Sequence, residues 1–300
     1  MFRNSYFSSS EQIINNILQR TRSAVYVYTQ FMKKEIKLLC SDIDGTLLNA
    51  ERYLSEVTVS AFAKANLPII LASSRMPSAM RYLQEGLSQL GSPLIAYNGG
   101  LILGRKSETL QSNTFSTQVL EALIPHHNLH SYNLSIYSYD NWFTDKEDPW
   151  SLREINNTRV QPEYQESQQS LYFLQEQKAE IHKLMCMGNP SEIDSIVAYL
   201  YPIYGEEVHL YRSKDSYLEI TPKHIDKAKA LEALLKSEYD FGLEAVMAFG
   251  DNHNDDELIR RVGLGVAVAN ATDLLKGKAD YVSLSTNKED AVAKAILKFL

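Results

Sequence analysis

The sequence has very few cysteines: Cys40 and Cys186 are the only two in its 300 residues. Two thiols are too few for a disulfide framework or a thiolate metal site, so a reducing compartment fits the chain best. The sequence also lacks an uninterrupted apolar run of ~18 residues, the length that a membrane-spanning helix needs, and we expect no membrane partner. Basic charge is not in surplus, because 30 Lys and Arg residues stand against 37 Asp and Glu. The formal net charge of -7 argues against non-specific binding to nucleic acid.

Residues 1–31 differ from the rest of the chain in charge, since they contain three arginines and a single acidic residue. They lack the continuous apolar stretch of a secretory signal, and we expect a cytoplasmic protein. We interpret this segment as an N-terminal extension that precedes the folded part. An organelle transit peptide, or a short helix over residues 10–20 that docks on the body, are the alternatives.

From residue 36 onwards, short apolar runs alternate with amphipathic stretches. This alternation is typical of βα units and a parallel sheet. The expected strands are residues 36–40, 67–72, 94–97, 245–249, 265–268 and 281–284, and the expected helices are residues 56–65, 77–90, 227–237, 255–262 and 288–300. We therefore predict an α/β fold with a doubly wound parallel-sheet, Rossmann-like core.

Residues 101–222 follow a different pattern, because several of their strand candidates alternate polar with apolar residues. Such alternation is typical of an antiparallel sheet with one solvated face. The strand candidates are residues 130–138, 181–187, 208–211 and 217–220, and the helix candidates are residues 116–123, 150–157 and 191–200. We interpret this segment as a second α/β domain, a cap inserted into a discontinuous core that consists of residues 32–100 and 223–300.

Two aspartates separated by one residue come directly after the first predicted strand, and a turn follows them: Asp42-Ile43-Asp44-Gly45-Thr46. Side chains alternate along a strand, so Asp42 and Asp44 start on the same side of its end. Two close carboxylates repel each other unless a cation lies between them, and Mg²⁺ prefers oxygen ligands. The pattern therefore predicts a metal site with one carboxylate free to attack.

Three further patches follow other predicted core elements: Ser73-Ser74-Arg75, Lys227 at a helix start, and the acidic run 250–256. Each patch has an ordinary explanation when it is taken alone, namely a helix cap, a solvated lysine and an acidic helix start. The carboxyl ends of parallel strands, however, meet at one edge of a sheet, where ligands bind. Together the patches predict a phosphate site beside a metal ion.

These four patches resemble the four motifs of the haloacid dehalogenase superfamily of phosphotransferases. Within it, the chain resembles the Cof-type phosphatases, which carry an α/β cap between the second and third motifs, and the resemblance covers residues 36–300. It implies Mg²⁺-dependent hydrolysis of a small phosphorylated metabolite through an aspartyl-phosphate. A sugar phosphate, flavin mononucleotide or pyridoxal phosphate is the type of substrate expected. The alternatives are a sugar phosphomutase and, in another class, a non-catalytic binding or regulatory protein.

The resemblance implies that Asp42 is the nucleophile and Asp44 the general acid and base. It implies that Asp251 coordinates Mg²⁺ together with Asp42 and the backbone carbonyl of Asp44. A general acid must be protonated at one stage of the reaction, so we expect a raised pKa at Asp44.

The resemblance also assigns phosphate binding to Ser73, Ser74, Lys227 and Asn254. It implies that Asp255, with Asn254, orients the groups around the metal. The second motif reads Ala-Ser-Ser-Arg where these proteins often have Ala-Thr-Gly-Arg, and the third reads Asp-Lys-Ala instead of Ser-Lys-Gly. Neither change removes a charge that the mechanism needs.

Substrate choice is assigned to the cap. Trp142 or Trp150 would stack on a sugar or ring, and Arg212 or Lys214 would reach a second anionic group. The alternative is that the aromatic residues simply fill the small core of the cap.

Overall fold

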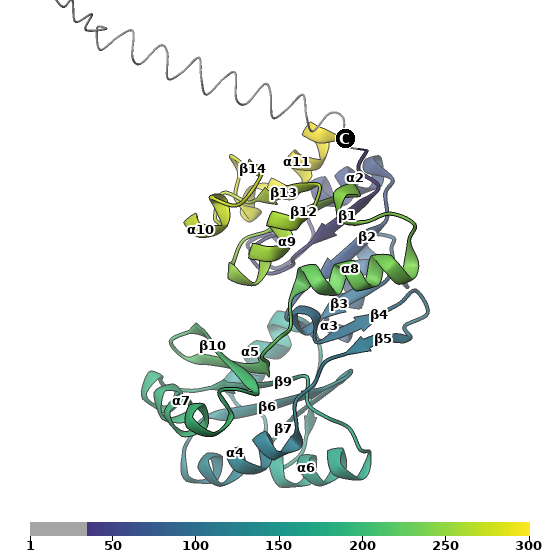
Figure 1. Ribbon diagram of the computed structural model, residues 1–300. Helices are drawn as coiled ribbons and strands as arrows, with labels where there is room; N and C mark the ends of the chain where they lie inside the picture. The colour runs from purple at the N-terminus through teal and green to yellow at the C-terminus, as the bar shows by residue number, and fades with distance from the viewer. Residues whose placement is uncertain (1–34) are drawn as a thin grey trace, which may run out of the picture.

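The computed structural model describes residues 35–300, and Figure 1 shows them as two lobes that each contain a sheet. The predicted extension, residues 1–31, lies outside the described residues. Within residues 35–300, no helix combines the length and the apolar character that crossing a membrane requires.

The first sheet is parallel from β14 to β3, and its last two strands are antiparallel. Its strands, in sheet order, are β14 (Tyr281–Val282), β13 (Leu264–Ala267), β12 (Val246–Gly250), β1 (Leu38–Ser41), β2 (Ile69–Ala72), β3 (Leu94–Ala96), β4 (Leu101–Leu103) and β5 (Thr109–Ser112). The order reverses at β1, which lies between β12 and β2. The predicted doubly wound parallel core is therefore confirmed.

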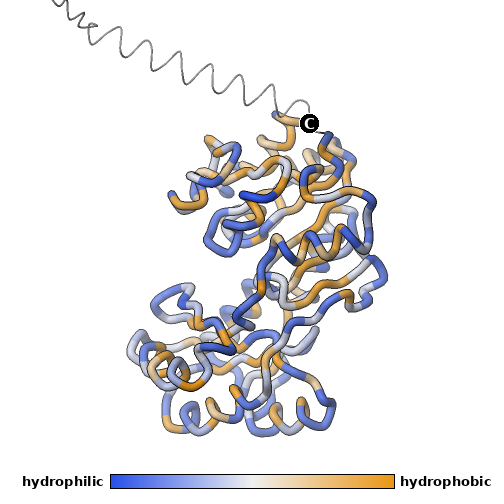
Figure 2. Tube along the Cα trace, viewed as in Figure 1, coloured by the Kyte–Doolittle hydropathy of each residue, from blue (hydrophilic) through white to orange (hydrophobic). Residues whose placement is uncertain are grey.

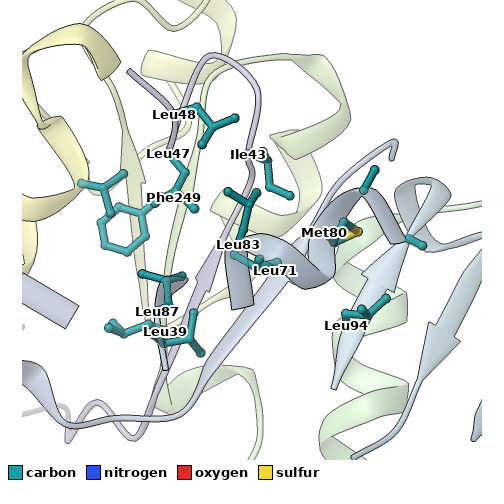
Figure 3. Packing of buried hydrophobic residues seen from close by; sticks show 14 of the residues in the cluster. Leu39, Ile43, Leu47, Leu48, Leu71, Met80, Leu83, Leu87, Leu94 and Phe249 are labelled. Carbon is teal, nitrogen blue, oxygen red and sulfur yellow. The ribbon is translucent and has the colours of Figure 1, made fainter. Parts of the chain in front are cut away.

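Helices cover both faces of this sheet because its strands are apolar on both sides. Leu39 packs with α2 (Glu56–Ala65), α3 (Ser78–Gly86) and α11 (Ala291–Phe299), and Figure 3 shows its cluster. The adjacent Leu38 points to the other face. The elements on that face are α8 (Lys227–Glu238), α9 (Asp256–Arg261) and α10 (Asp273–Lys276). Short 3₁₀ helices lie in the connections between the described elements: η1 (Tyr97–Gly99), η2 (Leu243–Ala245), η3 (His253–Asp255) and η4 (Asn287–Glu289).

The first sheet continues beyond residue 100, where the sequence places the boundary of the cap. Strand β4 pairs with β3, with Leu94 opposite Leu103, and β5 pairs with β4. Leu101 and Ile102 are buried on opposite faces of the sheet, which fixes this hairpin to the core. The division of the chain into folding units stays a prediction, but residues 101–112 lie in the core sheet, and their assignment to the cap is corrected.

The second sheet is antiparallel apart from the β7–β8 pair. Its strands, in sheet order, are β10 (Val208–Lys214), β11 (Tyr217–Pro222), β9 (Lys183–Met187), β6 (Asn133–Ser138), β7 (Asn141–Thr144) and β8 (Glu163–Tyr164). The helices of this lobe are α4 (Thr117–Leu129), α5 (Pro149–Thr158), α6 (Ser167–Glu176) and α7 (Pro190–Tyr204). Sequence patterning did not identify β7, β8 and α6.

The two faces of the second sheet have different partners. Alternate side chains such as Leu134, Leu184 and Leu218 pack against α4, α6 and α7 in a closed core. Their neighbours Lys183 and Tyr217 point to the opposite face, where Tyr217 belongs to the cluster that includes the first sheet. Figure 2 shows the hydrophobic stretches within both lobes. The face that the sequence predicts to be solvated is the face turned toward the core lobe.

Candidate active site

Asp42 and the turn behind it lie at the carboxyl end of β1. The Asp42 side chain is buried, and its backbone N–H donates to the carbonyl of Phe249 at 3.0 Å. Gly45 has a φ of +86°, and a Cβ at this position would lie 2.3 Å from Oδ2 of Asp251. Glycine is therefore required at this position for two reasons: the positive φ of the backbone and the close approach of Asp251.

Lys227 connects the first and last sequence patches. It opens α8, whose cap is Asp226, and its Nζ donates to Oδ1 of Asp42 and to Oδ1 of Asp255, each at 2.7 Å. The residue is 1% exposed. Burial lowers the pKa of Lys227, but the charges of Asp255 and then Asp42 outweigh burial, so the pKa lies above its ordinary value. The ammonium group therefore stays charged.

Asp255 is fully buried and holds the loop that carries Asp251. Its second oxygen, Oδ2, accepts from the backbone N–H groups of Asp251 at 3.0 Å and Asn252 at 3.2 Å. Both oxygens of Asp255 are thus already used by the protein. This arrangement supports the orienting role that the sequence resemblance implies, while the role itself stays a prediction.

Three carboxylates gather around one lysine. Oxygen atoms of Asp42, Asp251 and Asp255 lie within 4.8 Å of one another. Burial raises the pKa of Asp42, Lys227 opposes this, and the charges of Asp255 and Asp251 raise it further, for a net increase. Burial and then the charge of Asp255 raise the pKa of Asp251 to about 7. An oxygen-only donor set with more negative than positive charge fits a divalent cation such as Mg²⁺.

The side chain of Asp44 is held apart from this carboxylate cluster by two arginines. Nε of Arg75 donates to its Oδ2 at 2.7 Å, an Arg75 NH₂ group donates to its Oδ1 at 2.8 Å, and Arg52 also donates to Oδ1. Burial raises the pKa of Asp44, but the hydrogen bond and charge of Arg75 and the charge of Arg52 reverse this, so the pKa lies below its ordinary value. The expectation of a raised pKa is therefore wrong for this arrangement.

The serine patch lies at the carboxyl end of β2. Ser73 is buried, its Oγ accepts from the backbone N–H of Arg75 at 3.3 Å, and its carbonyl accepts from that of Asn98 at 2.8 Å. Ser74 is partly exposed, and its carbonyl accepts from Nζ of Lys183, on cap strand β9, at 3.1 Å. The loop that the sequence assigns to phosphate is thus linked directly to the cap.

Asn254 lies on another side of the site. It is exposed, and its amide donates to Oδ1 of Asn98 at 3.0 Å. With Lys227 it lines a cavity of about 470 Å³ that reaches toward β10. A smaller cavity of about 250 Å³ lies between Asp44 and Ser74 on the core and the polar face of the cap sheet. The structure therefore brings Asp42, Lys227, Asp251 and Asp255 together, and it places Asn254 and Ser74 in the walls of two different cavities.

Sequence reasoning missed several residues at this site. Arg52 follows Asp44 by only eight positions, yet no pattern indicates that it pairs with Asp44. Lys183 and Glu154 reach the smaller cavity from the cap, more than a hundred residues from Asp42 in the chain. Arg75 directly follows the two serines of the second patch, and this position was the one sequence signal that it belongs to the site.

Of the four cap residues that the sequence assigns to substrate binding, two line the smaller cavity and two do not. Trp142 and Lys214 line the smaller cavity. Trp150 packs edge-on against Tyr217, with ring centroids 5.7 Å apart, and Arg212 pairs with Asp194 on the exposed side of β10.

Comparison with known proteins gives consistent matches. A model of the haloacid dehalogenase-like hydrolase family matches residues 39–296. The 5-amino-6-(5-phospho-D-ribitylamino)uracil phosphatase of Bacillus subtilis is 30% identical over 267 residues, which cover 87% of this chain and 95% of that protein. A chloroplastic endoribonuclease YBEY of Arabidopsis thaliana is 27% identical over 281 residues; they cover 89% of this chain but only 47% of that relative. The structure of a haloacid dehalogenase-like hydrolase from Bacteroides thetaiotaomicron superimposes with a TM-score of 0.79 at 26% identity, over 89% of this chain and 100% of that chain.

Proposed function

The chain belongs to the haloacid dehalogenase-like hydrolases, and from this premise we propose that it is a Mg²⁺-dependent phosphatase that hydrolyses a small phosphorylated metabolite. The enzyme acts on a phosphoric monoester through an aspartyl-phosphate on Asp42. The observation that carries this proposal is the pairing of buried Asp42 with Lys227 at 2.7 Å, within a cluster of three carboxylates. A carboxylate nucleophile, a fixed cation and a metal-type donor set are the parts that phosphoryl transfer requires.

The two oxygens of Asp42 have separate tasks. Oδ1 is held by Nζ of Lys227, so Oδ2 attacks phosphorus in line with the leaving oxygen. Lys227 remains protonated and offsets the negative charge that collects on the carboxylate and the phosphoryl oxygens. Ser73 and Ser74 supply polar groups that hold the transferring phosphoryl group.

Mg²⁺ would be held by Asp42, Asp251 and the backbone carbonyl of Asp44, and it would supply charge neutralisation at the phosphoryl group. Asp255 keeps Asp251 in place through the two backbone hydrogen bonds of its loop. Thr46 donates to Oδ1 of Asp251 at 3.2 Å and fixes the orientation of that carboxylate.

The role of Asp44 follows from its low pKa. The carboxylate is ionised and fixed by Arg75, so it can accept a proton from the water that hydrolyses the aspartyl-phosphate. In the first step it passes to the leaving oxygen the proton that a monoanionic phosphate ester carries. The alcohol then leaves neutral.

The test is release of inorganic phosphate from a panel of sugar phosphates, nucleotides, flavin mononucleotide and pyridoxal phosphate, with and without Mg²⁺. The D42N variant should abolish release, whereas D240N, a change at an exposed aspartate, should leave it as it was. No release from any substrate by a folded, Mg²⁺-loaded protein would overturn the proposal. Turnover that needs an activating bisphosphate and releases no phosphate would identify a phosphomutase instead.

A further inference from the structure

One row of side chains across the cap sheet forms part of the wall of the smaller cavity. In the pairing of β7, β6 and β9, Trp142 stands opposite Tyr137, and Tyr137 stands opposite Lys183. The Trp142 and Tyr137 rings stack with centroids 5.7 Å apart, and Nζ of Lys183 lies 4.5 Å from the centre of the Tyr137 ring. These side chains share one face because residues directly opposite each other on neighbouring strands point to the same side of the sheet. The register of the cap sheet therefore brings a lysine to the cavity wall.

Several buried polar atoms of residues that line this cavity have no hydrogen-bond partner within the described part of the chain. They include Nε1 of Trp142 and the hydroxyl of Tyr217, whose residues are 3% and 5% exposed. A buried donor without a partner costs free energy, so such atoms are usually satisfied by water or by a ligand. Their place in the wall indicates a ligand that offers hydrogen-bonding groups.

Lys183 and Glu154 line the same cavity, yet each of them hydrogen-bonds to a different partner. Lys183 is 4% exposed, and its Nζ donates to the Ser74 carbonyl at 3.1 Å. Glu154 lies on α5, where Asn157 donates to it at 3.5 Å. Burial raises the pKa of Glu154, although the charge of Lys183 opposes this increase. The ammonium group of Lys183 and the carboxylate of Glu154 therefore line one cavity as a donor and an acceptor that do not bind each other.

We propose that Lys183 and Glu154 form a hydroxyl clamp that selects the leaving group of the phosphatase. A hydroxyl of a polyol or sugar accepts a hydrogen bond from Nζ of Lys183 and donates one to the carboxylate of Glu154. Trp142 and Tyr217 bind neighbouring oxygens of the same ligand. The inference rests on the proposed function, because the clamp recognises the alcohol part of a phosphate ester whose phosphorus lies at Asp42.

The clamp itself, rather than the net charge of the cavity, favours a hydroxyl over a second anionic group. The lining contains four cationic side chains against three acidic ones, and two of the cations, Arg52 and Arg75, both pair with Asp44. A second phosphate or a carboxylate would accept from Lys183 but would be repelled by the adjacent Glu154. A hydroxyl uses both the donor and the acceptor.

The experiment compares the specificity constant kcat/KM for three substrate classes in the Mg²⁺-loaded, full-length protein. The classes are p-nitrophenyl phosphate, which has no hydroxyl beyond its ester; ribitol 5-phosphate and glucose 6-phosphate, an acyclic and a cyclic arm; and fructose 1,6-bisphosphate. K183M removes the donor of the clamp, and E154Q removes the negative charge of its acceptor. The matched controls are K64M and E121Q, at exposed positions away from the cavity.

Loss of a hydrogen bond to a charged group should lower kcat/KM for the preferred hydroxylated substrate by about 10- to 100-fold relative to p-nitrophenyl phosphate. K64M and E121Q should leave this ratio within about twofold of the wild type. E154Q carries the inference even if K183M disturbs the Ser74 loop, because Glu154 has no hydrogen bond to that loop.

Equal losses for all three classes, or a wild-type preference for the bisphosphate, would overturn the clamp. Both results would leave the proposed phosphatase function standing, because p-nitrophenyl phosphate would still be hydrolysed by the wild type. Absence of phosphate release from every class would instead refute the proposed function.

Discussion

Replacement of Lys227 by methionine tests the reasoning about the site most directly. The side chain is 1% exposed, and its Nζ provides two hydrogen bonds of 2.7 Å, to Asp42 and Asp255. Methionine has a similar length and keeps the apolar packing of the chain stem. The change therefore removes mainly the charge and leaves two buried carboxylates, Asp42 and Asp255, without their cation, beside the half-buried Asp251.

The expected cost follows from the burial of both partners. Removal of one partner of a buried ion pair costs about 3–5 kcal/mol, because the remaining charge has neither water nor a counter-ion. We expect K227M to lower the free energy of unfolding by about that amount at pH 7.5 in EDTA. The loss should shrink at pH 5. The pKa values of Asp42 and Asp251 already lie above their ordinary values and would rise further, so these groups would take up protons in the folded state.

The assay is urea unfolding followed by circular dichroism at pH 7.5 and pH 5, with K64M as the control for a lysine-to-methionine change at an exposed position. A loss below about 1 kcal/mol at pH 7.5, the range expected of an exposed ion pair, would refute the reasoning. A loss that grows as the pH falls would contradict the sign of the argument. Phosphate release by K227M should be lower by at least about 100-fold, the scale of a lost electrostatic stabiliser.

Three further predictions concern the turn, the arginine pair and the metal. G45A places a methyl group 2.3 Å from the Asp251 carboxylate at a φ of +86°, so it should lower stability by about 1–3 kcal/mol and abolish Mg²⁺-dependent turnover. Thermal unfolding measures the first effect, and G277A should leave Tm nearly unchanged, because a Cβ at Gly277 would make only ordinary van der Waals contacts at 3.5 Å. R75M should raise the pKa of Asp44, because Arg75 lowers it in the native protein. The acidic limb of the pH profile of kcat/KM should therefore move to higher pH. A limb that does not move would show that Asp44 is not the titrating base. Mg²⁺ should raise Tm more at pH 8 than at pH 5, because Asp251, with a pKa of about 7 without metal, must lose its proton to bind; an equal rise at both pH values would contradict this.

Much of the core architecture could be predicted because it depends on local pattern. The helix predicted over residues 56–65 has the same bounds as α2, and in the structure Ser55 caps it and Phe62 is buried. Strands β7 and β8 were missed because they span only Asn141–Thr144 and Glu163–Tyr164, too short for two-residue periodicity to be visible. The hairpin β4–β5 was placed in the wrong lobe because pairing with β3 is a long-range property of the sheet edge.

The candidate site, too, could be predicted from the sequence only in part. The residue types and their positions after strands were readable in the chain, and Asp42, Lys227, Asp251 and Asp255 do converge. The protonation state of Asp44 was not readable, since Arg52 and Arg75 approach it only through the folded turn and the loop after β2.

The parallel core and the chemistry available at its carboxyl edge can be read from the chain, because strand periodicity and charged residues at strand ends are local properties. Which groups share a cavity depends on how the two lobes pack. The tertiary structure placed Lys183 and Glu154 of the cap above Asp44, and it turned two arginines onto that carboxylate. The physical reason is that pKa values and ligand contacts depend on distances of a few ångströms between residues far apart in the chain, and only packing sets those distances.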